Sequence, residues 1–525
     1  MSTTLAGPQG STAESPPTDR VLPPRWVKVL DQSRCIGCHA CTTACKSENA
    51  VPVGVSRTYV KSVEVGRFPQ VRRAFQVTRC NQCEDAPCVA ACPTGAMYRR
   101  PDGIVDFDKR ICIGCKACIA ACPYDAIFIN PEDHSAEKCN FCAHRLDVGL
   151  EPACVVVCPT EAIQVGDLND PTSEVAKVVQ RQPVVVRRPE KHTRPGVYYK
   201  GAHQATLDPL AADRPSGGTF AWAQMPSGKG VVNSGNPAAR GHATSSAAAI
   251  VSYDVAHQLP WGWRVSLYTW TKGLAAGGYL VPVLLAVAGV TPWSSVLLRY
   301  VGPAIGLGAL GLTAFLLVSD LKHPRRFYLL LTKHQWRSWL VRGAVILSLY
   351  AGVLVAQLAI GVSGSVLAPI VLAGAGVPVG VMAAVYTAYL FAQSRGRDLW
   401  QSPVLAPHLA IEALLVGAAA LAPAAAVLVP SAVHSLEVLV ASTAAAHLLL
   451  RLAETTSHHP TANARLASRE MTHGRYAPWF WVGGVAIAIG MLAPLLGWWA
   501  GLVALAGLFP HEHSYVQAAQ AVPLA

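Results

Sequence analysis

Long apolar runs occupy the second half of the chain and begin near residue 265. A run of about 20 apolar residues is long enough to cross a bilayer as an α-helix. Such runs predict transmembrane helices over 264–289, 297–319, 338–361, 366–392, 404–428, 431–452, 478–494 and 496–516. The last two runs are short and are separated only near Pro494 and Gly497, so seven helices are the alternative to eight. We therefore predict an all-α, multi-pass membrane domain over residues 256–525.

The first half of the chain has shorter apolar runs that alternate with polar residues. Residues 58–80 alternate with a period of two and contain Val, Tyr and Phe, which predicts a β-hairpin. A strand is predicted to start near Trp26, and further short strands are predicted within 103–112 and 125–133. Together these elements indicate an α+β domain over residues 26–168.

The segments that flank this domain lack such periodicity. Residues 1–25 are polar and rich in Ser, Thr and Pro, with neither the apolar stretch of a signal peptide nor a twin-arginine pair. We expect a disordered tail there. Residues 201–250 are rich in Gly, Ala, Ser and Pro, which predicts a linker. We accordingly assign residues 169–255 to a tail and linker between the two domains.

All sixteen cysteines of the 525-residue chain lie between Cys35 and Cys158. They form four groups: Cys35, Cys38, Cys41 and Cys45; Cys80, Cys83, Cys88 and Cys92; Cys112, Cys115, Cys118 and Cys122; and Cys139, Cys142, Cys154 and Cys158. Three close cysteines and a fourth that binds a neighbouring cluster are typical of bacterial ferredoxins. Four ligands per cluster predict four [4Fe-4S] clusters in a double-ferredoxin fold, and therefore a protein that transfers electrons singly.

Two other uses of cysteine fit the sequence less well. Disulfide frameworks are typical of small secreted domains, and zinc sites use isolated CxxC pairs without a trailing Cys-Pro. The net charge of +12 could indicate nucleic acid, but the basic residues are dispersed among predicted membrane loops and cysteine motifs, so we expect no nucleic-acid partner. Because metal binding and folding are coupled, loss of iron should unfold this domain.

The order of the cysteine spacings resembles the iron–sulfur subunits of molybdenum-enzyme complexes, such as DMSO, polysulfide and tetrathionate reductases. In that family the motifs nest, which implies four ligand sets: Cys35, Cys38, Cys41 with Cys158; Cys139, Cys142, Cys154 with Cys45; Cys80, Cys83, Cys88 with Cys122; and Cys112, Cys115, Cys118 with Cys92. The resemblance also implies a separate catalytic partner that holds a molybdopterin or tungstopterin. Nothing in this chain resembles such a pterin-binding subunit.

Two further phrases, VGDLNDPTS (165–173) and HTRPGVYY (192–199), resemble the tails of those iron–sulfur subunits. In the family these tails lie against the catalytic partner. An ordinary helix started by Thr172 or Ser173, followed by a surface loop, is the alternative.

In the second half, SLYTWTKGLAAGGYL (266–280), SDLKHPRRFYLLL (319–331) and RDLWQSP (397–403) resemble the NrfD-like membrane subunits of the polysulfide reductase family. Such subunits are usually separate polypeptides, so the chain resembles a fusion of two subunits. The resemblance implies exchange of electrons with the membrane quinone pool, menaquinone or ubiquinone, at the end of the membrane domain nearest the clusters.

Ionisable residues inside the predicted helices support a quinone site, because charge in a bilayer is costly and a quinone needs hydrogen-bond partners and proton carriers. Lys272 lies about 12 Å into its helix, at a rise of about 1.5 Å per residue, and Glu412 lies at similar depth. The predicted quinone and proton site consists of Lys272, Glu412, Asp320, Tyr389 and His408, with Tyr386 and His447 at the same depth.

Each of these residues also has a structural alternative. Lys272 could extend its amine to the membrane interface, and Glu412 could pair with an arginine. Asp320 could cap its helix and bind the cysteine-rich domain. Glu437 and His434 lie in the far half of the membrane domain, where we favour a structural role over a proton path.

Basic residues are concentrated in the three loops on the side of the cysteine-rich domain. These loops hold eleven of them: Lys322, Arg325, Arg326, Lys333, Arg337, Arg395, Arg397, Arg451, Arg465, Arg469 and Arg475. The opposite loops hold little beyond Arg299. The positive-inside rule therefore predicts that the clusters face the cytoplasm. The alternative is that these arginines bind the cysteine-rich domain.

Taken together, these features predict the electron-transfer and membrane-anchor subunit of a respiratory, quinone-reactive oxidoreductase that serves anaerobic respiration. Substrate catalysis is expected on the pterin-containing partner. The same relay run in reverse for a formate-type dehydrogenase is one alternative. A redox-driven, ion-translocating module is another.

Overall fold

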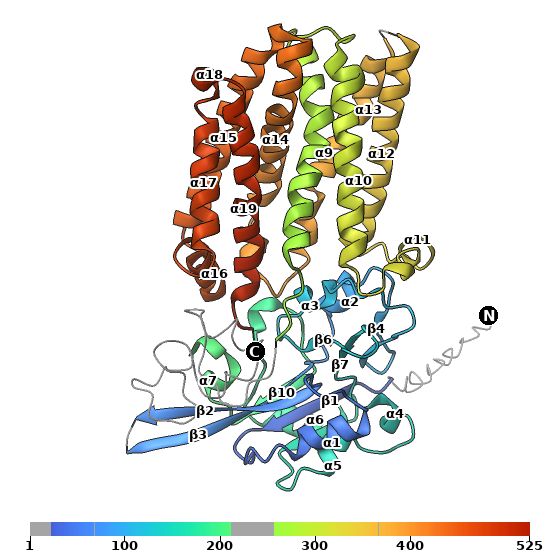
Figure 1. The fold of residues 1–525 in the computed structure, drawn as a ribbon. Helices are drawn as coiled ribbons and strands as arrows, with labels where there is room; N and C mark the ends of the chain where they lie inside the picture. Colours follow the sequence, from blue (N-terminus) through green and yellow to red (C-terminus); the bar gives the residue numbers. More distant parts are fainter. Residues whose placement is uncertain (1–22, 68, 212–256, 366, 525) are drawn as a thin grey trace, which may run out of the picture.

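The computed structural model describes residues 23–67, 69–211, 257–365 and 367–524. Figure 1 shows an N-terminal domain, residues 23–211, beneath a bundle of long helices formed by residues 257–524, the helical domain. Most of the predicted tail and of the predicted linker lies outside the described residues. The order of the two parts is the predicted one, an α+β domain followed by an all-α domain.

A four-stranded sheet organises the N-terminal domain. Its strand order is β8 (Ile163–Asp167), β1 (Trp26–Asp31), β10 (Val197–Lys200) and β9 (Val184–Val185). β1 pairs antiparallel with β8 and parallel with β10, with Lys28 opposite Val197. Alternate residues of β1, Val27 and Val29, are buried against Val175 of helix α6 (Glu174–Arg181).

The N-terminal domain extends past residue 168, where the sequence had placed its end. The HTRPGVYY phrase contributes β10 to the sheet, and the VGDLNDPTS phrase runs from β8 to the start of α6, directly after Ser173. The alternative of an ordinary helix started near Ser173 therefore describes the VGDLNDPTS phrase, although Ser173 makes no side-chain capping bond. The physical reason for the later boundary is that β10 satisfies the open edge of β1.

The predicted hairpin is present. β2 (Thr58–Arg67) and β3 (Gln70–Arg79) pair antiparallel, from Thr58 opposite Arg79 to Arg67 opposite Gln70. Two shorter hairpins contain the strands predicted within 103–112 and 125–133: β4 (Met97–Arg99) with β5 (Val105–Phe107), and β6 (Ile127–Ile129) with β7 (Ala136–Lys138). Short helices connect the strands, namely α1 (Ala40–Glu48), α2 (Pro87–Ala91), α3 (Ala117–Ala121), α4 (Ala143–Leu146) and α5 (Ala153–Val156), and α7 (Gln204–Leu207) follows β10.

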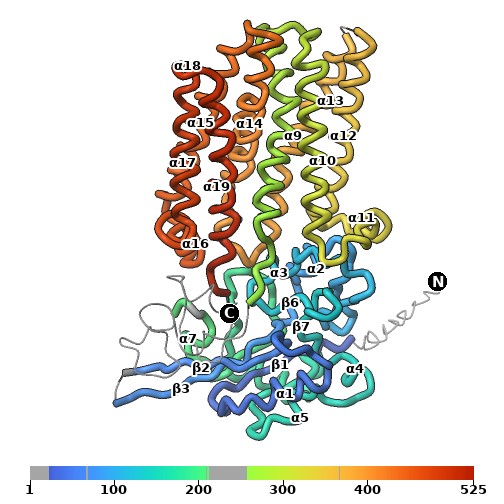
Figure 2. The backbone as a smooth tube through the Cα atoms, in the orientation of Figure 1, coloured from blue at the N-terminus to red at the C-terminus, as the bar shows by residue number. Residues whose placement is uncertain are grey.

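The long helices of the helical domain stand side by side (Figures 1 and 2). Within the described residues their bounds are α9 (Trp263–Val287), α10 (Gly302–Asp320), α12 (Trp339–Ser363), α13 (Ala368–Ala392), α14 (Leu405–Leu428), α15 (Val433–Thr456), α17 (Ala477–Gly490) and α19 (Trp499–Ala521). A π-helical turn, η4 (Leu297–Val301), precedes α10.

Within the described residues, six of these helices are long and apolar enough to cross a membrane: α9, α10 with η4, α12, α13, α14, and α15 with the turn that starts at Pro430. The other two correspond to the short seventh and eighth runs: α17 has 14 residues and α19 has 23. The four-residue helix α18 (Ala493–Leu496) separates them near Pro494 and Gly497, where the sequence predicted a break. The predicted count of eight is thus compatible with the structure.

Small residues bring α9 and α14 into backbone contact. A Cβ atom added to Gly277 would lie 2.0 Å from the carbonyl oxygen of Ala413, and one added to Gly417 would lie 2.5 Å from the carbonyl carbon of Gly277. Small residues allow this kind of close crossing between membrane helices. Lys272 and Glu412 each lie five residues before this crossing, so the contact holds both at one level of the bundle.

The two domains share one hydrophobic core. Alanines of α2 and α3 pack with aromatic residues at the near end of the bundle: Ala91, Ala117, Ala120 and Ala121 with Trp261, Phe391 and Trp400. Trp400 is fully buried, and its ring stacks on Phe391 with 4.5 Å between centroids. Close apolar packing of this kind fixes the N-terminal domain to the end of the bundle at which α9 begins (Figure 1).

Candidate functional site

The four CxxC loops adopt a common backbone turn. The third residue of each loop has a positive φ: 70° at Gly37, 48° at Gln82, 66° at Gly114 and 63° at Phe141. Turns that include this conformation let successive backbone N–H groups converge on an anion. The repeated turn therefore prepares each loop to surround a group that carries negative sulfur atoms.

Two of the hollows in the N-terminal domain are lined by cysteines. One, with an empty volume of about 370 Å³, is lined by Cys92, Cys112, Cys115 and Cys118. The other, of about 320 Å³, is lined by Cys35, Cys38, Cys41 and Cys158. In both hollows one cysteine comes from another motif: Cys92 joins the group that starts at Cys112, and Cys158 joins the group that starts at Cys35, as the resemblance implied.

The remaining eight cysteines also form two groups. The Asn49 amide lies 3.7 Å from the sulfur of Cys45 and 3.8 Å from that of Cys142, and Cys45 interacts electrostatically with Cys139, Cys154 and Cys142. Cys88 interacts electrostatically with Cys80, Cys122 and Cys83. The structure thus brings together the same four sets of four.

The surroundings of the sulfur atoms fit iron–sulfur clusters. Backbone N–H groups donate to several sulfurs, for example Met97 to Cys92 at 3.3 Å, Ala136 to Cys112 at 3.4 Å and Ala162 to Cys158 at 3.2 Å. Hydrogen bonds to sulfur and burial are the features that set cluster potentials. Four soft thiolates around each hollow, with amide donors behind them, are a donor set suited to [4Fe-4S] clusters.

One sulfur has two buried cations beside it. The Arg79 guanidinium donates to the sulfur of Cys154 at 3.3 Å, and the Lys28 ammonium donates to the same sulfur at 3.7 Å. Burial raises the pKa of the Cys154 thiol, but Lys28 and Arg79 outweigh that effect and lower this pKa to about 7. By contrast, burial raises the pKa of Cys41 to about 11. The cluster that includes Cys154 therefore lies in the more positive environment.

The loop of Cys112 to Cys118 faces the helical domain. The Trp261 indole donates to the carbonyl of Cys115 at 3.2 Å, and the backbone N–H of His323 donates to the carbonyl of Ile113 at 3.1 Å. A Cβ atom added to Gly114 would lie 2.4 Å from the Cβ of Lys322, so only glycine fits against this loop of the helical domain. This cysteine group is therefore built into the contact between the domains.

Lys272 and Glu412 lie inside the helical domain and are both buried. The Lys272 ammonium donates to the carbonyl of Ala384 and lies 5.1 Å from the ring centroid of Tyr386. Glu412 packs close to Gly273, the residue after Lys272: a Cβ atom added to Gly273 would lie 3.6 Å from one Glu412 oxygen. Within the described residues, neither carboxylate oxygen of Glu412 has a hydrogen-bond partner. These two predicted residues therefore lie at one level on the adjacent helices α9 and α14 and interact electrostatically.

A second group of ionisable residues lies at the same end of the bundle. Arg451 was predicted to lie in a loop, and this is wrong: α15 extends to Thr456, and Arg451 is buried within it. Arg451 bridges Glu454 and Glu512, at 2.7 Å from each, and these pairings offset the cost of a cation in an apolar helix. His408, the third predicted residue, lies 3.6 Å from Glu512.

The sequence reasoning missed Glu512 and His511. The motif HEH at 511–513, inside the eighth apolar run, could have identified them, because ionisable residues within a membrane segment are costly and so indicate a functional or paired position. The imidazoles of His408 and His447 lie 4.2 Å apart between ring centroids, and those of His447 and His511 lie 5.3 Å apart.

The structure does not bring Asp320 and Tyr389 into this group. Asp320 forms an ion pair of 2.8 Å with Lys116 in the contact between the domains, as its structural alternative predicted. Tyr389 stacks on Trp339 with 4.5 Å between ring centroids, and 41% of its surface is exposed on the outside of the bundle. Lys272, Glu412 and His408 are therefore the members of the predicted site that lie inside the bundle.

Comparison with protein families assigns both halves of the chain. A 4Fe-4S binding domain matches residues 26–47, and a 4Fe-4S dicluster domain matches residues 71–168. The family described as polysulphide reductase, NrfD, matches residues 252–503. The predicted fold class, a ferredoxin-type domain followed by a helical membrane domain, is thereby confirmed.

Curated relatives match the first half. The chain is 46% identical over 180 residues to the protein NrfC homolog of Haemophilus influenzae, covering 34% of this chain and 80% of the relative. It is 44% identical over 190 residues to a tetrathionate reductase subunit of Salmonella typhimurium, covering 35% and 76%. It is also 44% identical over 177 residues to a polysulfide reductase polypeptide of Wolinella succinogenes, covering 33% and 93%.

Proposed function

We propose a function from the premise that this protein belongs to the family of iron–sulfur electron-transfer subunits that includes NrfC and its counterparts in polysulfide and tetrathionate reductases, fused here to an NrfD membrane domain. It is a multi-pass membrane protein with 4Fe-4S binding domains. Its proposed task is to relay electrons between membrane quinone, menaquinone or ubiquinone, and a separate catalytic subunit. The observation that carries the proposal is that one cysteine group and the buried pair Lys272 and Glu412 occupy the same end of the bundle.

At the quinone end, Lys272 and Glu412 supply what the reaction needs. A quinone takes up two protons with two electrons, so a site needs donors for its oxygens and a group that accepts and returns protons. The Lys272 ammonium is a donor, and the unpartnered Glu412 carboxylate is a proton acceptor buried beside it. His408 lies one helical turn from Glu412 and connects it to the Arg451 group.

In this proposal four [4Fe-4S] clusters carry the electrons between the quinone site and the catalytic subunit. The Cys92 set lies against the helical domain, whereas Cys38 of the Cys35 set is exposed on the N-terminal domain. When bound, the clusters supply one-electron steps, and the protein positions them and excludes water. About 16 iron atoms per protein molecule are expected, at four per cluster.

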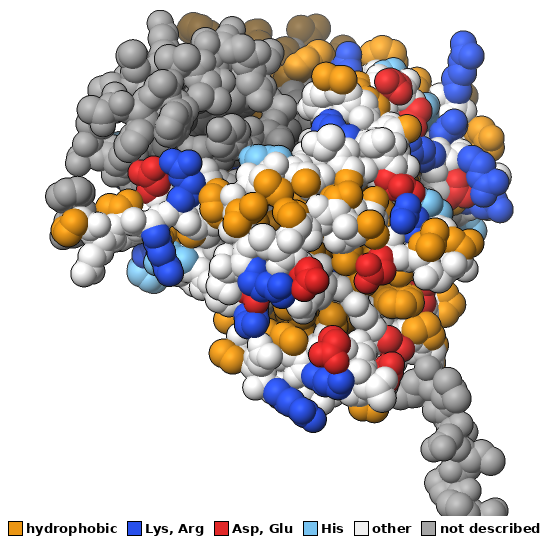
Figure 3. All heavy atoms as spheres, turned by 90° about the horizontal axis from the view of Figure 1, so that it is seen from below, with side chains coloured by type: hydrophobic (Ala, Val, Ile, Leu, Met, Phe, Trp, Pro, Cys, Tyr) orange, Lys and Arg blue, Asp and Glu red, His pale blue; other side chains and the backbone are white. Residues whose placement is uncertain are grey.

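The face around Cys38 is the proposed exit to the catalytic subunit. Apolar side chains beside the cysteine loops are exposed there: Ile36 by 59%, Val53 by 96% and Val156 by 59%. Figure 3, which views the molecule from below, shows hydrophobic side chains interspersed with charged ones on this side. Exposed apolar groups beside a redox centre suit a partner interface. The names of the relatives as reductase subunits support a molybdopterin or tungstopterin partner.

The decisive experiment tests the reaction with quinol separately from electron transfer through the clusters. We expect K272M and E412Q to abolish reduction of the clusters by quinol in the purified complex, while an artificial dye still reduces them. E437Q is the matched control, because Glu437 lies on α15 in the far half of the bundle and pairs with His434 at 3.8 Å. Quinol activity at the wild-type rate in both K272M and E412Q would remove these residues from the site.

We further propose that the N-terminal domain faces the cytoplasm, on the grounds of the positive-inside rule. Several of the basic residues have a second role, since Arg326 donates to the carbonyls of Lys109 and Cys112 and Arg397 donates to that of Gln520. Reporter fusions to the loop after α9 would decide the orientation: activity of a periplasmic reporter there supports the proposal, and activity of a cytoplasmic reporter contradicts it.

The direction of electron flow depends on the potentials of the clusters. Transfer from quinol to a reductase is the proposed direction, because the similar relatives are named as subunits of reductases. Clusters that all titrate well below the quinone potential would instead favour the formate-dehydrogenase type of relay.

A further inference from the structure

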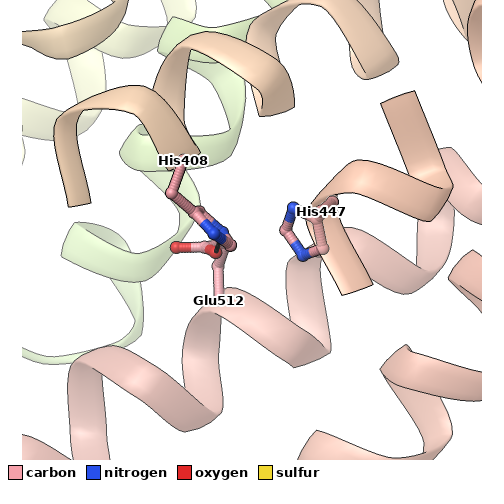
Figure 4. Close-up of side chains that lie close together, drawn as sticks. All are labelled: His408, His447 and Glu512. Atoms are coloured by element: carbon pink, nitrogen blue, oxygen red, sulfur yellow. Dashed lines mark ion pairs between the residues drawn. The ribbon is translucent and has the colours of Figure 1, made fainter. Parts of the chain in front are cut away.

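Three side chains from three helices converge inside the bundle. His408 of α14, His447 of α15 and Glu512 of α19 each offer a ligand atom, and these atoms all lie within 4.8 Å of one another. Figure 4 shows the His408 ring beside the Glu512 carboxylate, with the His447 ring directed toward them. All three residues are buried.

The imidazole of His447 lacks a partner, and Nε2 of His408 faces the Glu512 carboxylate. Within the described residues, both ring nitrogens of His447 are buried and have no hydrogen bond, whereas Nε2 of His408 lies 3.6 Å from Oε1 of Glu512. Leaving a buried polar atom without a partner costs about 1–3 kcal/mol. A neutral imidazole carries one lone-pair nitrogen and one N–H group. The lone pair of His447, beside His408 and the Glu512 carboxylate, can therefore be satisfied by a ligand that accepts lone pairs. The neighbouring His511 also has a buried Nε2 without a hydrogen bond among the described residues.

We propose that His408, His447 and Glu512 bind a divalent transition-metal ion, zinc being the ion that matches the ligands best. Two neutral imidazoles and one carboxylate form a His₂Glu set, and zinc binds such ligands at about 2.0–2.2 Å. Tetrahedral bonds of about 2.0–2.1 Å place ligand atoms roughly 3.4 Å apart, so zinc binding must draw the present ligand atoms, which lie within 4.8 Å of one another, closer together. Three protein ligands leave a fourth position open, as in zinc sites that hold water.

The neighbouring charges accommodate the ion. Arg451 pairs with the carboxylates of Glu454 and Glu512. Both Arg451 and His408 contact the same oxygen of Glu512, Oε1. A metal can therefore bind the other oxygen, Oε2. Glu454 pairs with Arg451, and so offsets the positive charge that would otherwise oppose the ion.

The zinc site shares His408 with the proposed quinone and proton site, but it is a separate proposal, because zinc transfers no electrons. It would tie α14, α15 and α19 together beside Lys272 and Glu412. Its presence can be tested without any measurement of quinol oxidation, so failure of one proposal leaves the other standing.

The test is the metal content of the purified full-length holoprotein after exchange into metal-free buffer and addition of one zinc ion per protein molecule. We expect about one tightly bound zinc, with an X-ray absorption spectrum that shows nitrogen and oxygen ligands at about 2.0–2.1 Å and no sulfur shell at about 2.3 Å. The sulfur shell distinguishes zinc that has entered a cysteine motif.

The variants H447A and E512Q are expected to lose this zinc, while H434A retains it. His434 lies on the same helix as His447, but its side chain is 78% exposed. Unchanged iron content and cluster EPR signals would show that a variant is folded. Wild-type protein without zinc, zinc with sulfur ligands only, or full retention in folded H447A would each overturn the proposal.

Discussion

At the scale of single residues, Lys28 and Arg79 show how the protein can set a cluster potential. Both side chains are buried, and both donate to the sulfur of Cys154. A nearby positive charge stabilises the reduced, more negative cluster, and so raises its reduction potential. These two cations are therefore expected to give the cluster bound by Cys154 a higher potential than it would otherwise have.

Removing either charge should lower that potential. K28Q and R79Q keep a polar group but lose a charge that, at 4 Å and an effective dielectric of about 20, is worth about 4 kcal/mol. The expected shift of one cluster is on the order of 100 mV downward, measured by redox titration with EPR detection. R73Q is the control, because Arg73 lies on the same strand as Arg79 and pairs with Glu64 at the surface. Unchanged potentials in both variants would contradict the prediction.

The cysteines and the ionisable residues of the bundle differ in how far the sequence could predict them. Ligand spacing is local, so the sixteen cysteines could be recognised at once, and the structure groups them as the resemblance implied. Lys272 and Glu412 could be found by their depth in apolar runs. Asp320 could not be assigned, because its partner Lys116 is far away in the sequence and in the other domain.

At the scale of elements, the crossing of α9 and α14 sets the distance between Lys272 and Glu412. The variant G277A places a methyl group about where the Ala413 carbonyl oxygen lies, so the helices must separate. Overpacking of this kind costs about 1–3 kcal/mol. We expect a lower unfolding temperature in detergent and weaker quinol oxidation.

The control for this change is G308A. Gly308 lies on α10, and no other atom lies within 4 Å of the position of its Cβ, so this variant is expected to be neutral or slightly stabilising. If G277A and G308A unfold at the same temperature, the close crossing is not a determinant of stability.

Iron removal tests the dependence of the N-terminal domain on its clusters. The described strands there are short, apart from the β2–β3 hairpin, and the cysteines themselves line much of its core. Chelation under anaerobic conditions is expected to abolish the strand signal in circular dichroism while the helical signal persists. A domain that keeps its strands after complete loss of iron would show that the clusters are not needed for folding.

The elements also show which parts of the fold sequence periodicity can predict and which it cannot. Periodicity predicted the hairpin and the apolar helices, because both are local. It missed β10, since a four-residue strand is recognisable only through its pairing with β1, which lies about 170 residues earlier in the sequence. It placed Arg451 in a loop because a buried arginine is compatible with a helix only when Glu454 and Glu512 are beside it.

At the scale of the whole molecule, described residues outside the segment that joins the two domains make extensive contact between them. The shared core, the ion pair of Lys116 with Asp320 and the hydrogen bonds around Cys112 to Cys118 all lie elsewhere. After cleavage at a protease site inserted at residue 230, the halves are expected to migrate together in size-exclusion chromatography. Separation on cleavage alone would contradict this.

The double variant K116A/D320A should weaken the association, because it removes a largely buried ion pair from the interface. The double variant D108A/R110A is the control, since that pair lies at the surface of the N-terminal domain. We expect the first variant, and not the second, to release part of the N-terminal domain after cleavage at moderate salt.

The backbone carbonyl of Leu524 accepts hydrogen bonds of 3.2 Å from both Arg187 and Arg188, which are 337 and 336 residues away in sequence. A ribosome that adds about 5–20 residues per second needs roughly 20–70 s to make the residues that separate them. During most of that interval the described strands of the N-terminal domain have been synthesised, but Arg187 and Arg188 still lack the carbonyl of Leu524. We therefore expect a period of synthesis in which iron can reach the cysteines before the segment around Leu524 packs against the domain.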